Sequence, residues 1–376
     1  RDGFADVFIG TYVKFGPNSK QYCRLHENGV LSSCRPLDYD PEQSELFRNR
    51  GDGTFEPVGK KWGLSAVNGK NLGAAVGDFN RDGWPDLYLA NDEMPQDLLL
   101  NEGGKRFRNV GAEAGAAYLG DGRMMGGMGV DWGDIDNDGW LDIIVGTYEN
   151  EAKALFRNLQ GQSFEWATPA SQLTGPTYPS VVFGTLFFDF DNDGARDVIF
   201  ANGHVFDNVA EIKPNSTFRQ PTQLFRNRGN GVFDPVHCPV LDEPIVGRGL
   251  ATGDYDEDGD LDLLVVDADG PVRLLRNNAA AGRNWLSLRL IGTESNPDAL
   301  GAQVTVTAGG NRYFDEVRTT RGYASFCDGR VHFGLGSTSH VDSIEIRWPS
   351  GKVTRRGNVA ANQVLEVREP GVKAND

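Results

Sequence analysis

The chain has 376 residues, which is ample length to bury a hydrophobic core. Its 37 Lys and Arg against 53 Asp and Glu give a net charge of −16, and such a surface repels phosphate backbones, so nucleic acid is a poor partner. The 48 glycines and 18 prolines indicate many tight turns and favour an all-β fold, and the absence of an apolar run of roughly 18 residues predicts a chain that does not span a membrane.

Two cysteines lie near the beginning of the chain, in a segment rich in Pro, Gly, Ser and Asn. Cys23 and Cys34 are 11 residues apart, and a disulfide between them would hold a segment that has little core of its own. Two free thiols are the alternative. Cys238 and Cys327 lie in different regions, where we expect buried free thiols; a disulfide that joins the two regions is the alternative.

An acidic motif recurs along the chain at intervals of about 55 to 80 residues. It has the pattern D-x-[DN]-x-D-G-x-x-D, and the complete copies are DFNRDGWPD at 78–86, DIDNDGWLD at 134–142, DFDNDGARD at 189–197 and DYDEDGDLD at 254–262. The opening RDGFAD is the second half of the same motif, with Asp2 matching Asp82 and Asp6 matching Asp86. The chain therefore begins inside a repeat.

Each repeat predicts four strands in a fixed order. A strand of small residues such as GAAVGDF enters the acidic loop, and a β-rich strand such as LYLA leaves it. A third strand ends in Asn, as in LFRN at 155–158, and a short fourth strand follows a glycine turn at Phe55, Phe107, Phe164 and Phe233. Four strands per repeat are typical of a β-propeller blade, and small residues suit the crowded innermost strand.

The acidic loops predict calcium sites. Carboxylates at loop positions 1, 3 and 5 converge when the chain curls tightly at the glycine of position 6, and position 9 supplies a last carboxylate. Asx turns without metal are the alternative, but so many carboxylates in one turn would repel each other without a cation. We expect about four to five structural Ca²⁺ ions, with ligands Asp2, Asp6, Asp78, Asn80, Asp82, Asp86, Asp134, Asp136, Asp138, Asp142, Asp189, Asp191, Asp193, Asp197, Asp254, Asp256, Asp258 and Asp262.

The repeats resemble the FG-GAP or VCBS repeats of integrin-α-type propellers. The C-terminal part resembles the ASPIC/UnbV domain of the cartilage acidic protein family and its bacterial relatives, through Asn284-Trp285-Leu286, Ser295-Asn296, Gly301-Ala302-Gln303-Val304, Gly322-Tyr323, His332-Phe333-Gly334-Leu335-Gly336 and Arg347-Trp348-Pro349-Ser350-Gly351. Asn80 departs from the motif by replacing an Asp, and the first loop lacks positions 1 to 4. The resemblance implies a propeller of seven blades when complete, with N-terminal blades missing here.

The predicted organisation has three parts. Residues 1–278 form the propeller, residues 283–369 form a small β-sandwich or barrel-like domain packed on the last blade, and residues 370–376 are a tail. The second domain is less acidic than the propeller. We expect its arginines to dock it against the negative propeller, with solvated charges as the alternative; they are Arg318, Arg321, Arg347, Arg355 and Arg356.

Blade topology predicts where a partner binds. The acidic loops and the short glycine turns lie on one face, so the long irregular connections lie on the opposite face, where loops on a rigid frame carry recognition. Small hydrophobic clusters beneath the loops are the alternative explanation for their aromatic residues. The candidate ligand-binding residues are Tyr22, His26, Trp62, Tyr178, His204, Asp207 and Arg219.

We therefore expect a calcium-stabilised recognition, adhesion or assembly module without catalysis, secreted or on the cell surface, with the periplasm as a further location. Its partner would be an extracellular protein or glycan. One alternative is a propeller lyase or dehydratase acting on extracellular carbohydrate, with His204, Tyr178 and Arg219 as candidate catalytic residues. Another is a structural subunit of a larger extracellular complex, which would expose a contiguous apolar patch.

Overall fold

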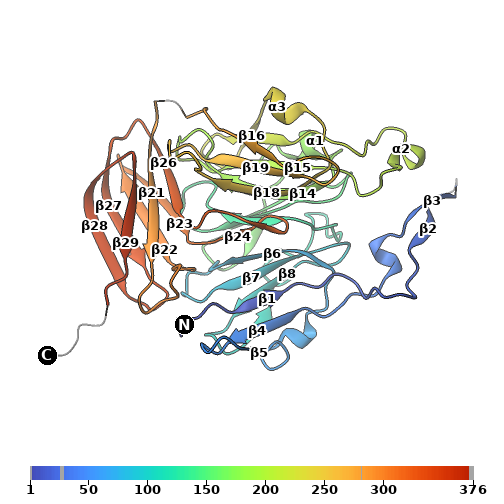
Figure 1. Ribbon diagram of the computed structural model, residues 1–376, viewed down its shortest axis with the longest axis horizontal. Helices are drawn as coiled ribbons and strands as arrows, with labels where there is room; N and C mark the ends of the chain where they lie inside the picture. Colours follow the sequence, from blue (N-terminus) through green and yellow to red (C-terminus); the bar gives the residue numbers. More distant parts are fainter. Residues whose placement is uncertain (1, 26–28, 281, 372–376) are drawn as a thin grey trace.

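The computed structural model describes residues 2–25, 29–280 and 282–371, and nearly all regular structure in these ranges is β (Figure 1). Five antiparallel sheets follow each other along the first part of the chain, and in each the strands are paired in chain order. This is the arrangement of propeller blades, so the all-β propeller prediction is confirmed.

The strands of the five blades begin and end as follows. Blade 1 contains β1 (Val7–Ile9), β4 (Glu45–Asn49) and β5 (Phe55–Pro57); blade 2 contains β6 (Asn71–Gly77), β7 (Asp86–Asn91), β8 (Asp97–Asn101) and β9 (Phe107–Asn109). Blade 3 contains β10 (Val130–Gly133), β11 (Asp142–Val145), β12 (Ala154–Asn158) and β13 (Phe164–Trp166). Blade 4 contains β14 (Val182–Phe188), β15 (Asp197–Asn202), β16 (Gln223–Asn227) and β17 (Phe233–Val236), and blade 5 contains β18 (Gly247–Gly253), β19 (Asp262–Asp267) and β20 (Arg273–Leu275).

Small residues in the inner strands let neighbouring blades approach closely. A Cβ atom added to Gly73 of β6 would lie 2.1 Å from the backbone oxygen of Met128, and one added to Gly129 would lie 2.0 Å from the oxygen of Phe183. These distances leave no room for a side chain, as expected for the innermost position. Adjacent blades also bury large apolar side chains against each other, such as Tyr88 of β7 against the ring of Trp132 in β10.

The C-terminal part forms two facing sheets. One has the order β26-β21-β29 and the other β23-β22-β27-β28, from strands β21 (Asn284–Ile291), β22 (Gln303–Ala308), β23 (Asn311–Glu316), β26 (Val331–Gly336), β27 (His340–Arg347), β28 (Val353–Ala360) and β29 (Gln363–Arg368). Their inner faces share one apolar core that includes Leu286, Val304 and Ile344. The region is therefore a β-sandwich.

A hairpin of this sandwich lies among the inner strands of the propeller (Figure 1). It is made of β24 (Thr320–Arg321) and β25 (Ser325–Phe326), and Gly322 forms a β-bridge with Val130 of β10. The guanidinium of Arg321 donates to Asp131 at 2.6 Å. The sandwich was predicted to pack on the last blade, but its contact with the propeller is wider. Its β24–β25 hairpin extends toward the propeller axis and contacts β10 of blade 3.

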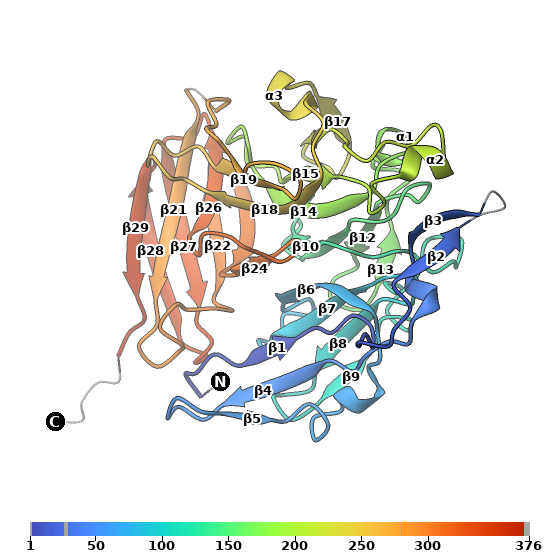
Figure 2. The ribbon, with the colours of Figure 1, turned by 45° about the vertical axis from the view of Figure 1, so that its right-hand side comes forward.

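Short helices and an additional hairpin occupy the connections. The hairpin consists of β2 (Tyr22–Leu25) and β3 (Val30–Ser33); the helices are α1 (Thr174–Thr177), α2 (Val209–Ile212), α3 (Pro239–Asp242) and the 3₁₀ turns η1 (Pro36–Asp38) and η2 (Leu64–Ala66). Figures 1 and 2 both place the β2–β3 hairpin and α2 on the side of the propeller away from the sandwich. In the described ranges no helix has the length and apolar character that a membrane span requires.

Candidate metal centres and the opposite loop face

The four complete acidic loops share one backbone geometry. In the loop of blade 3, Asp134 at position 1 accepts the backbone N–H of Asp138 at 3.1 Å and that of Gly139 at 2.9 Å. Asp78, Asp189 and Asp254 accept the equivalent pairs of amides in their own loops. The first carboxylate therefore fixes the tight curl that the motif predicts.

The last aspartate of each motif connects the loop to the third strand. In blade 3 Asp142 accepts the backbone N–H of Asn158 at 2.7 Å and that of Ile135 at 3.0 Å. The Asn158 amide group in turn donates to the backbone oxygens of Leu141 and Phe79, the latter in the neighbouring blade. This explains why the third strand of each repeat ends in Asn.

Three loops bring carboxylates together from positions 1, 3 and 9. Within each group, one oxygen per residue lies within 4.8 Å of the others; the groups are Asp134, Asp136 and Asp142; Asp189, Asp191 and Asp197; and Asp254, Asp256 and Asp262. The fifth-position carboxylates, which the sequence analysis also proposed as ligands, lie outside these groups; they are Asp82, Asp138, Asp193 and Asp258. Their oxygens instead accept the backbone N–H two residues later, as Asp138 does from Trp140 at 3.0 Å.

Burial raises the pKa of most of these carboxyl groups. It raises the pKa of Asp134 to about 7 and that of Asp86 to about 9, and it raises the pKa of Asp142 and Asp197 well above the usual range. The ionised form is disfavoured because burial removes water, and the neighbouring carboxylates of the same loop add to the shift. A divalent cation would supply the missing countercharge.

Blade 2 differs from this pattern because Asn80 stands at position 3. Its amide donates to Asp82 at 3.1 Å, and its oxygen accepts the backbone N–H of Asp82 at 3.1 Å. An amide oxygen is also a calcium ligand. Asp78 and Asp86 remain at positions 1 and 9, so positions 1, 3 and 9 of this loop offer two carboxylates and one amide oxygen, and Asp82 remains at position 5.

In blades 3 to 5 an arginine of the third-strand segment forms an ion pair with the acidic loop of its own blade. These ion pairs were not predicted from the sequence. Arg157 Nη2 lies 2.6 Å from Asp136, Arg226 Nη2 lies 2.6 Å from Asp193, and Arg276 Nη2 lies 2.9 Å from Asp258. The recurring Arg before the final Asn of LFRN was the available signal. In blade 2 the third strand has Leu100 at this position, and the same loop is the one with Asn80 in place of Asp.

The opening half-motif also keeps part of this geometry. Asp6 accepts the backbone N–H of Asn49 at 2.8 Å, as the last aspartate does in the later blades. Asp2 pairs with Arg48 at 3.0 Å. These two carboxylates match positions 5 and 9, so blade 1 holds half a site.

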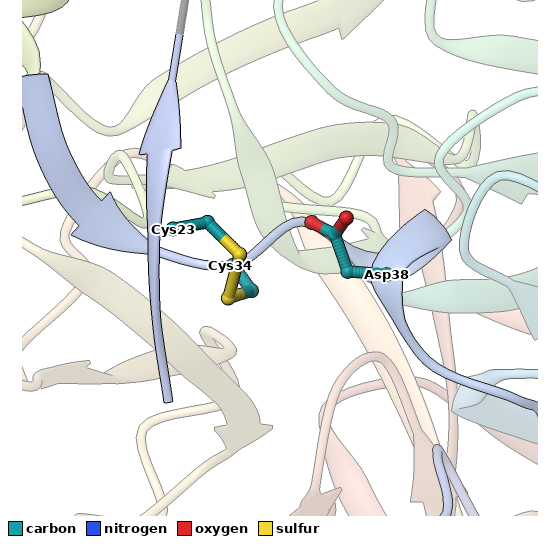
Figure 3. A group of neighbouring side chains, drawn as sticks. All are labelled: Cys23, Cys34 and Asp38. Carbon is teal, nitrogen blue, oxygen red and sulfur yellow. A yellow bond between two sulfur atoms is a disulfide. The ribbon is translucent and has the colours of Figure 1, made fainter. Parts of the chain in front are cut away.

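The donor set fits Ca²⁺ in the complete loops. Carboxylate oxygens, all buried or half-buried except those of Asp256, converge in a tight turn and are hard ligands. The raised pKa values of Asp134 and Asp189 reflect burial without sufficient countercharge. One further group of metal-ligand residue types does not fit, because two members are bonded to each other. Cys23 and Cys34 form a disulfide with a Cα–Cα distance of 4.8 Å, and Asp38 lies beside it (Figure 3).

The disulfide prediction is confirmed, and Cys238 and Cys327 are free thiols. The Cys23–Cys34 bond joins the two strands of the β2–β3 hairpin, and the hairpin lies against the connection of blade 4 that contains α2. The hydroxyl of Ser32 donates to Asn208 at 2.9 Å, and Cys23 packs with Ile212 of α2. An insertion of the first blade thus crosses the loop face to reach the fourth.

The sandwich contacts the acidic loops directly. The side-chain amide of Gln303 donates to Asp78 at 2.8 Å, and His332 Nε2 lies 2.7 Å from the Asn192 side-chain oxygen. Burial lowers the pKa of His332 to about 3, so its imidazole is neutral and Nε2–H donates to Asn192. Loop residues of blades 2 and 4 therefore form part of the surface on which the sandwich lies.

One hydrogen bond to the backbone and one ion pair extend this contact. Arg330 Nη2 donates to the backbone oxygen of Asp254 at 2.9 Å, and Arg196 Nη2 lies 2.6 Å from Asp315 of the sandwich. Of the arginines expected to dock the sandwich, Arg318 donates to the backbone oxygen of Trp132, as the prediction requires.

The remaining arginines do not serve this contact. Arg347 and Arg355 pair with Glu345 within the sandwich itself, at 3.0 and 2.7 Å. Arg356 is exposed. The docking prediction therefore holds for Arg318 and Arg321. Arg347, Arg355 and Arg356 are surface charges instead, because their strands β27 and β28 lie at the end of the sheet away from β23.

His204 is buried within a polar cluster on the loop face. Its Nδ1 accepts the backbone N–H of Phe206 at 3.0 Å, so Nε2 carries the proton and faces the Tyr148 hydroxyl at 3.1 Å and the Glu149 carboxylate at 3.5 Å. Burial raises the pKa of Glu149, but hydrogen bonds from His204, Lys213 and Ser216 outweigh it and lower the pKa to about 2. Of this cluster only His204 was predicted on the loop face; the grouping was not, because its members come from two separate connections.

The other candidate ligand-binding residues are spread over the molecule. Tyr22, Tyr178 and Asp207 are exposed, and Arg219 pairs with Asp269 at 2.7 Å. Trp62 lines an open cavity of about 590 Å³ together with Asp78 and Trp84. His26 lies outside the described residues. The guanidinium of Arg219 is thus directed to an ion pair at blade 5 rather than to the His204 ring.

Comparison with known protein families matches both parts of the chain. Residues 1–89, 78–145, 134–200 and 189–265 match the FG-GAP-like repeat, and residues 292–374 match ASPIC and UnbV. Cartilage acidic protein 1 of Homo sapiens is 28% identical over 98% of this chain and 55% of its own length, and that of Mus musculus is 27% identical over 98% and 56%. The chain therefore spans about half the length of these relatives.

Similar solved structures include an Agrocybe aegerita lectin that recognises non-reducing terminal N-acetylglucosamine, at 18% identity and a TM-score of 0.36, covering 69% of this chain and 66% of that one. The Dos1 propeller is 12% identical at a TM-score of 0.33, covering 93% of this chain and 84% of that one. These partial structural likenesses carry no functional inference. The family matches show the family: the chain belongs to the FG-GAP-like repeat family, and its C-terminal part carries the ASPIC and UnbV domain.

Proposed function

We propose that the chain is a calcium-stabilised extracellular recognition module, without catalysis of its own, that binds protein or glycan through the face opposite the acidic loops. The observation that carries the proposal is the division of the molecule into two faces. Acidic loops and the sandwich occupy one side of the propeller, and the long connections with exposed Tyr22 and Tyr178 occupy the other. Loops on a rigid frame are the usual place for recognition.

The calcium part of the proposal rests on the convergent carboxylates. About four to five ions would be held by the acidic loops, with positions 1, 3 and 9 of each complete loop as the core ligands. Bound calcium would neutralise buried carboxylates in consecutive blades. The ions would therefore act on folding stability rather than on a reaction.

The extracellular part is supported by the disulfide and by the relatives. A disulfide persists in oxidising compartments, and the Cys23–Cys34 bond holds an exposed hairpin that has only a small apolar cluster beneath it. The similarity to cartilage acidic protein 1 points in the same direction. We place the protein outside the cell or on its surface.

The alternative of a lyase or dehydratase has less support from the geometry. His204 is fully buried, and its ring nitrogens face the Phe206 amide, Tyr148 and Glu149. A general base must reach the proton that it removes, and this ring has no exposed atom. A hydrogen-bonded structural role accounts for all of its contacts.

The proposal is tested by binding to defined ligands. The fluorescently labelled chain is applied in calcium to an array of neutral and acidic polysaccharides and to immobilised extracellular matrix proteins. The Tyr22→Ala/Tyr178→Ala variant is compared with Phe326→Ala, which removes an exposed ring from the hairpin of the sandwich. We expect a specific signal that the first variant loses and the second keeps. Equal binding of both variants, or no binding to either surface, would contradict a recognition role of the loop face.

A further inference from the structure

Charge is distributed unevenly along the chain. The whole sequence carries 37 Lys and Arg against 53 Asp and Glu, a net charge of −16. Residues 14–35, which lead into the β2–β3 hairpin and include it, reverse this balance. Their one carboxylate is Glu27, and their four cations are Lys14, Lys20, Arg24 and Arg35. A short positive segment therefore belongs to a strongly acidic protein.

Three of these cations share one face of the hairpin, because side chains alternate between the two faces of an extended strand. Cys23 and Ser32 are buried on the inner face, toward α2. Lys20 and Arg35 continue the opposite alternation beyond the ends of the ladder, and Arg35 keeps an extended backbone with φ −78° and ψ 160°. The outer face of the hairpin, as we call it, consists of the exposed residues Lys20, Tyr22, Arg24, Leu31, Ser33 and Arg35.

No carboxylate within the described ranges forms an ion pair with the cations of the outer face. Arg24 donates to the backbone oxygen of Gly29 at 3.0 Å. Asp38, which lies beside the disulfide, accepts the backbone N–H of Arg35 at 2.9 Å. Other exposed arginines do pair with a neighbouring carboxylate, as Arg123 does at 2.7 Å. The charge of the outer face is therefore available to a partner.

Two large side chains are exposed between these cations. Tyr22 is 61% exposed and Leu31 is 57% exposed, and the register of β2 and β3 makes them diagonal neighbours. Tyrosine and arginine are the residues that contribute most to binding at many interfaces. The Cys23–Cys34 disulfide holds the two strands together, so a partner need not supply the free energy to order them.

The position of the hairpin limits the shape of an anionic partner. Figures 1 and 2 show the hairpin at the edge of the molecule, on the side of the propeller away from the sandwich. Exposed charges are screened beyond roughly 8 Å at physiological ionic strength, so a slender anionic polymer on the hairpin would meet mainly the local cations. A membrane or a broad acidic protein surface would also face the acidic propeller and be repelled.

We propose that the outer face of the hairpin binds an acidic polysaccharide, a linear glycan whose sugar rings carry carboxylate or sulfate groups. The guanidinium groups of Arg24 and Arg35 and the ammonium of Lys20 would pair with the anionic groups. The Tyr22 ring would lie against the apolar face of a sugar ring between them. This inference rests on the proposed recognition function, because it names the class of glycan and the part of the loop face that binds it.

The test measures binding isotherms of the chain in calcium with three labelled acidic polysaccharides and one neutral one. The acidic probes are polygalacturonate, chondroitin sulfate and dextran sulfate, and the neutral probe is dextran. We expect the chain to bind at least one acidic probe more tightly than dextran, and added salt to weaken this binding. A preference for polygalacturonate or for the sulfated probes identifies the anionic group. Binding of dextran alone, or of none of the four, would overturn the proposal.

Charge-removing substitutions assign the binding to the hairpin. Lys20→Gln/Arg24→Gln/Arg35→Gln should weaken binding about tenfold, the order expected from three exposed ion pairs, while thermal unfolding stays unchanged because all three residues are exposed. The charge-keeping variant Lys20→Arg/Arg24→Lys/Arg35→Lys should retain most of the affinity.

A matched control removes one lysine and two arginines elsewhere. Lys105→Gln/Arg289→Gln/Arg356→Gln changes the net charge by the same amount at exposed residues outside the hairpin. It should bind like the wild type. If both charge-removing variants lost the same affinity, binding would follow the net charge of the chain and the hairpin would not be the site.

Two further probes separate this inference from the proposed function. If polyglutamate or vesicles that contain phosphatidylserine bound as tightly as the polysaccharides, the partner would be an acidic peptide or a membrane and the proposal would be wrong. A neutral glycan or a matrix protein could instead bind in a manner that Tyr22→Ala/Tyr178→Ala abolishes and the charge-removing hairpin variant keeps. Recognition by the loop face would then stand while this proposal fails. Absence of any ligand would contradict both.

Discussion

Glu369 illustrates how one buried carboxylate organises a loop of the sandwich. It accepts the backbone N–H groups of Thr293, Glu294 and Ser295, each at 2.8 Å, and the hydroxyl groups of Ser295 and Ser350. Burial raises the pKa of Glu369, but these hydrogen bonds outweigh it and lower the pKa to about 2. The ionised form is therefore the one that stabilises the fold.

Glu369→Gln is predicted to lower the free energy of unfolding by about 2 kcal/mol, the contribution of hydrogen bonds to a charged acceptor. Because the folded pKa lies below the usual value of 4.5, the wild-type contribution is full above pH 4.5 and is lost as the pH falls toward 2. Urea unfolding between pH 3 and pH 7 measures it. The variant should show a flatter pH dependence; Glu366→Gln, at an exposed residue of β29, should behave like the wild type.

Arg321 and Asp131 form a buried ion pair between the hairpin and the inner strand β10. Arg321→Met is predicted to destabilise the protein by about 3–5 kcal/mol, because it leaves the fully buried Asp131 carboxylate without its partner. Adding Asp131→Leu should recover a large part of the loss. Thermal and denaturant unfolding measure both variants against the exposed control Arg356→Met. If Arg321→Met lost no more stability than the control, the ion pair between the hairpin and β10 would not stabilise the propeller.

At the scale of elements, the β2–β3 hairpin depends on its disulfide and on one polar contact with α2. Replacing Cys23 and Cys34 by Ser is predicted to release the hairpin locally, at a cost of about 2–3 kcal/mol to that segment. Hydrogen exchange in β2, β3 and α2 should accelerate while the strands β10 to β17 stay protected. Asn208→Ala removes the hydrogen bond at the other end and should give a weaker form of the same change. Loss of protection throughout the propeller would show instead that the hairpin supports the whole fold.

The strands of the blades were predictable because both the composition of each segment and its spacing within the repeat indicate a strand. The fourth strands begin at Phe55, Phe107, Phe164 and Phe233 as predicted, and the third strands of blades 1 to 4 end at the Asn of their LFRN-type segments, while that of blade 5 ends two residues before its Asn. The β2–β3 and β24–β25 hairpins were not predicted. Both are single copies without a repeat to reveal them, and both derive their stability from distant partners, Asn208 and Asp131.

The metal site was predictable only in part for a similar reason. The spacing indicates which carboxylates approach each other, and in three loops positions 1, 3 and 9 do so, whereas one oxygen of position 5 accepts the amide of position 7. Side-chain direction depends on the turn conformation, which the spacing alone does not contain. The contact of Gln303 with Asp78 was out of reach of any local pattern, because 225 residues separate the two.

At the scale of the whole molecule, the acidic loops serve two contacts at once. Asp78 belongs to a candidate metal site and accepts Gln303 of the sandwich, and Asn192 of another loop accepts His332. Loop conformation and sandwich docking are therefore coupled. Calcium removal is predicted to accelerate hydrogen exchange in β22 and β26 as well as in the loops, and Gln303→Ala should weaken this coupling at blade 2.

The β27–β28 pair supplies the reference for this prediction. Its partners are within the sandwich, so its exchange should change little when calcium is removed. Equal acceleration in β22 and in β27–β28 would mean that the sandwich unfolds rather than undocks. No change in β22 would mean that docking is independent of the loops.

Calcium bound by the acidic loops is proposed to stabilise the propeller. The most direct measurement is a calorimetric titration of the chelator-treated chain with calcium chloride, followed by thermal unfolding of the same samples. We predict saturation at about four to five ions, the loss of one ion when Asp134, Asp136 and Asp142 are replaced by Asn, and no loss when the exposed Asp52 and Asp121 are replaced. If the chain took up no calcium and unfolded at the same midpoint in calcium and in chelator, calcium would not be a structural ligand of the acidic loops.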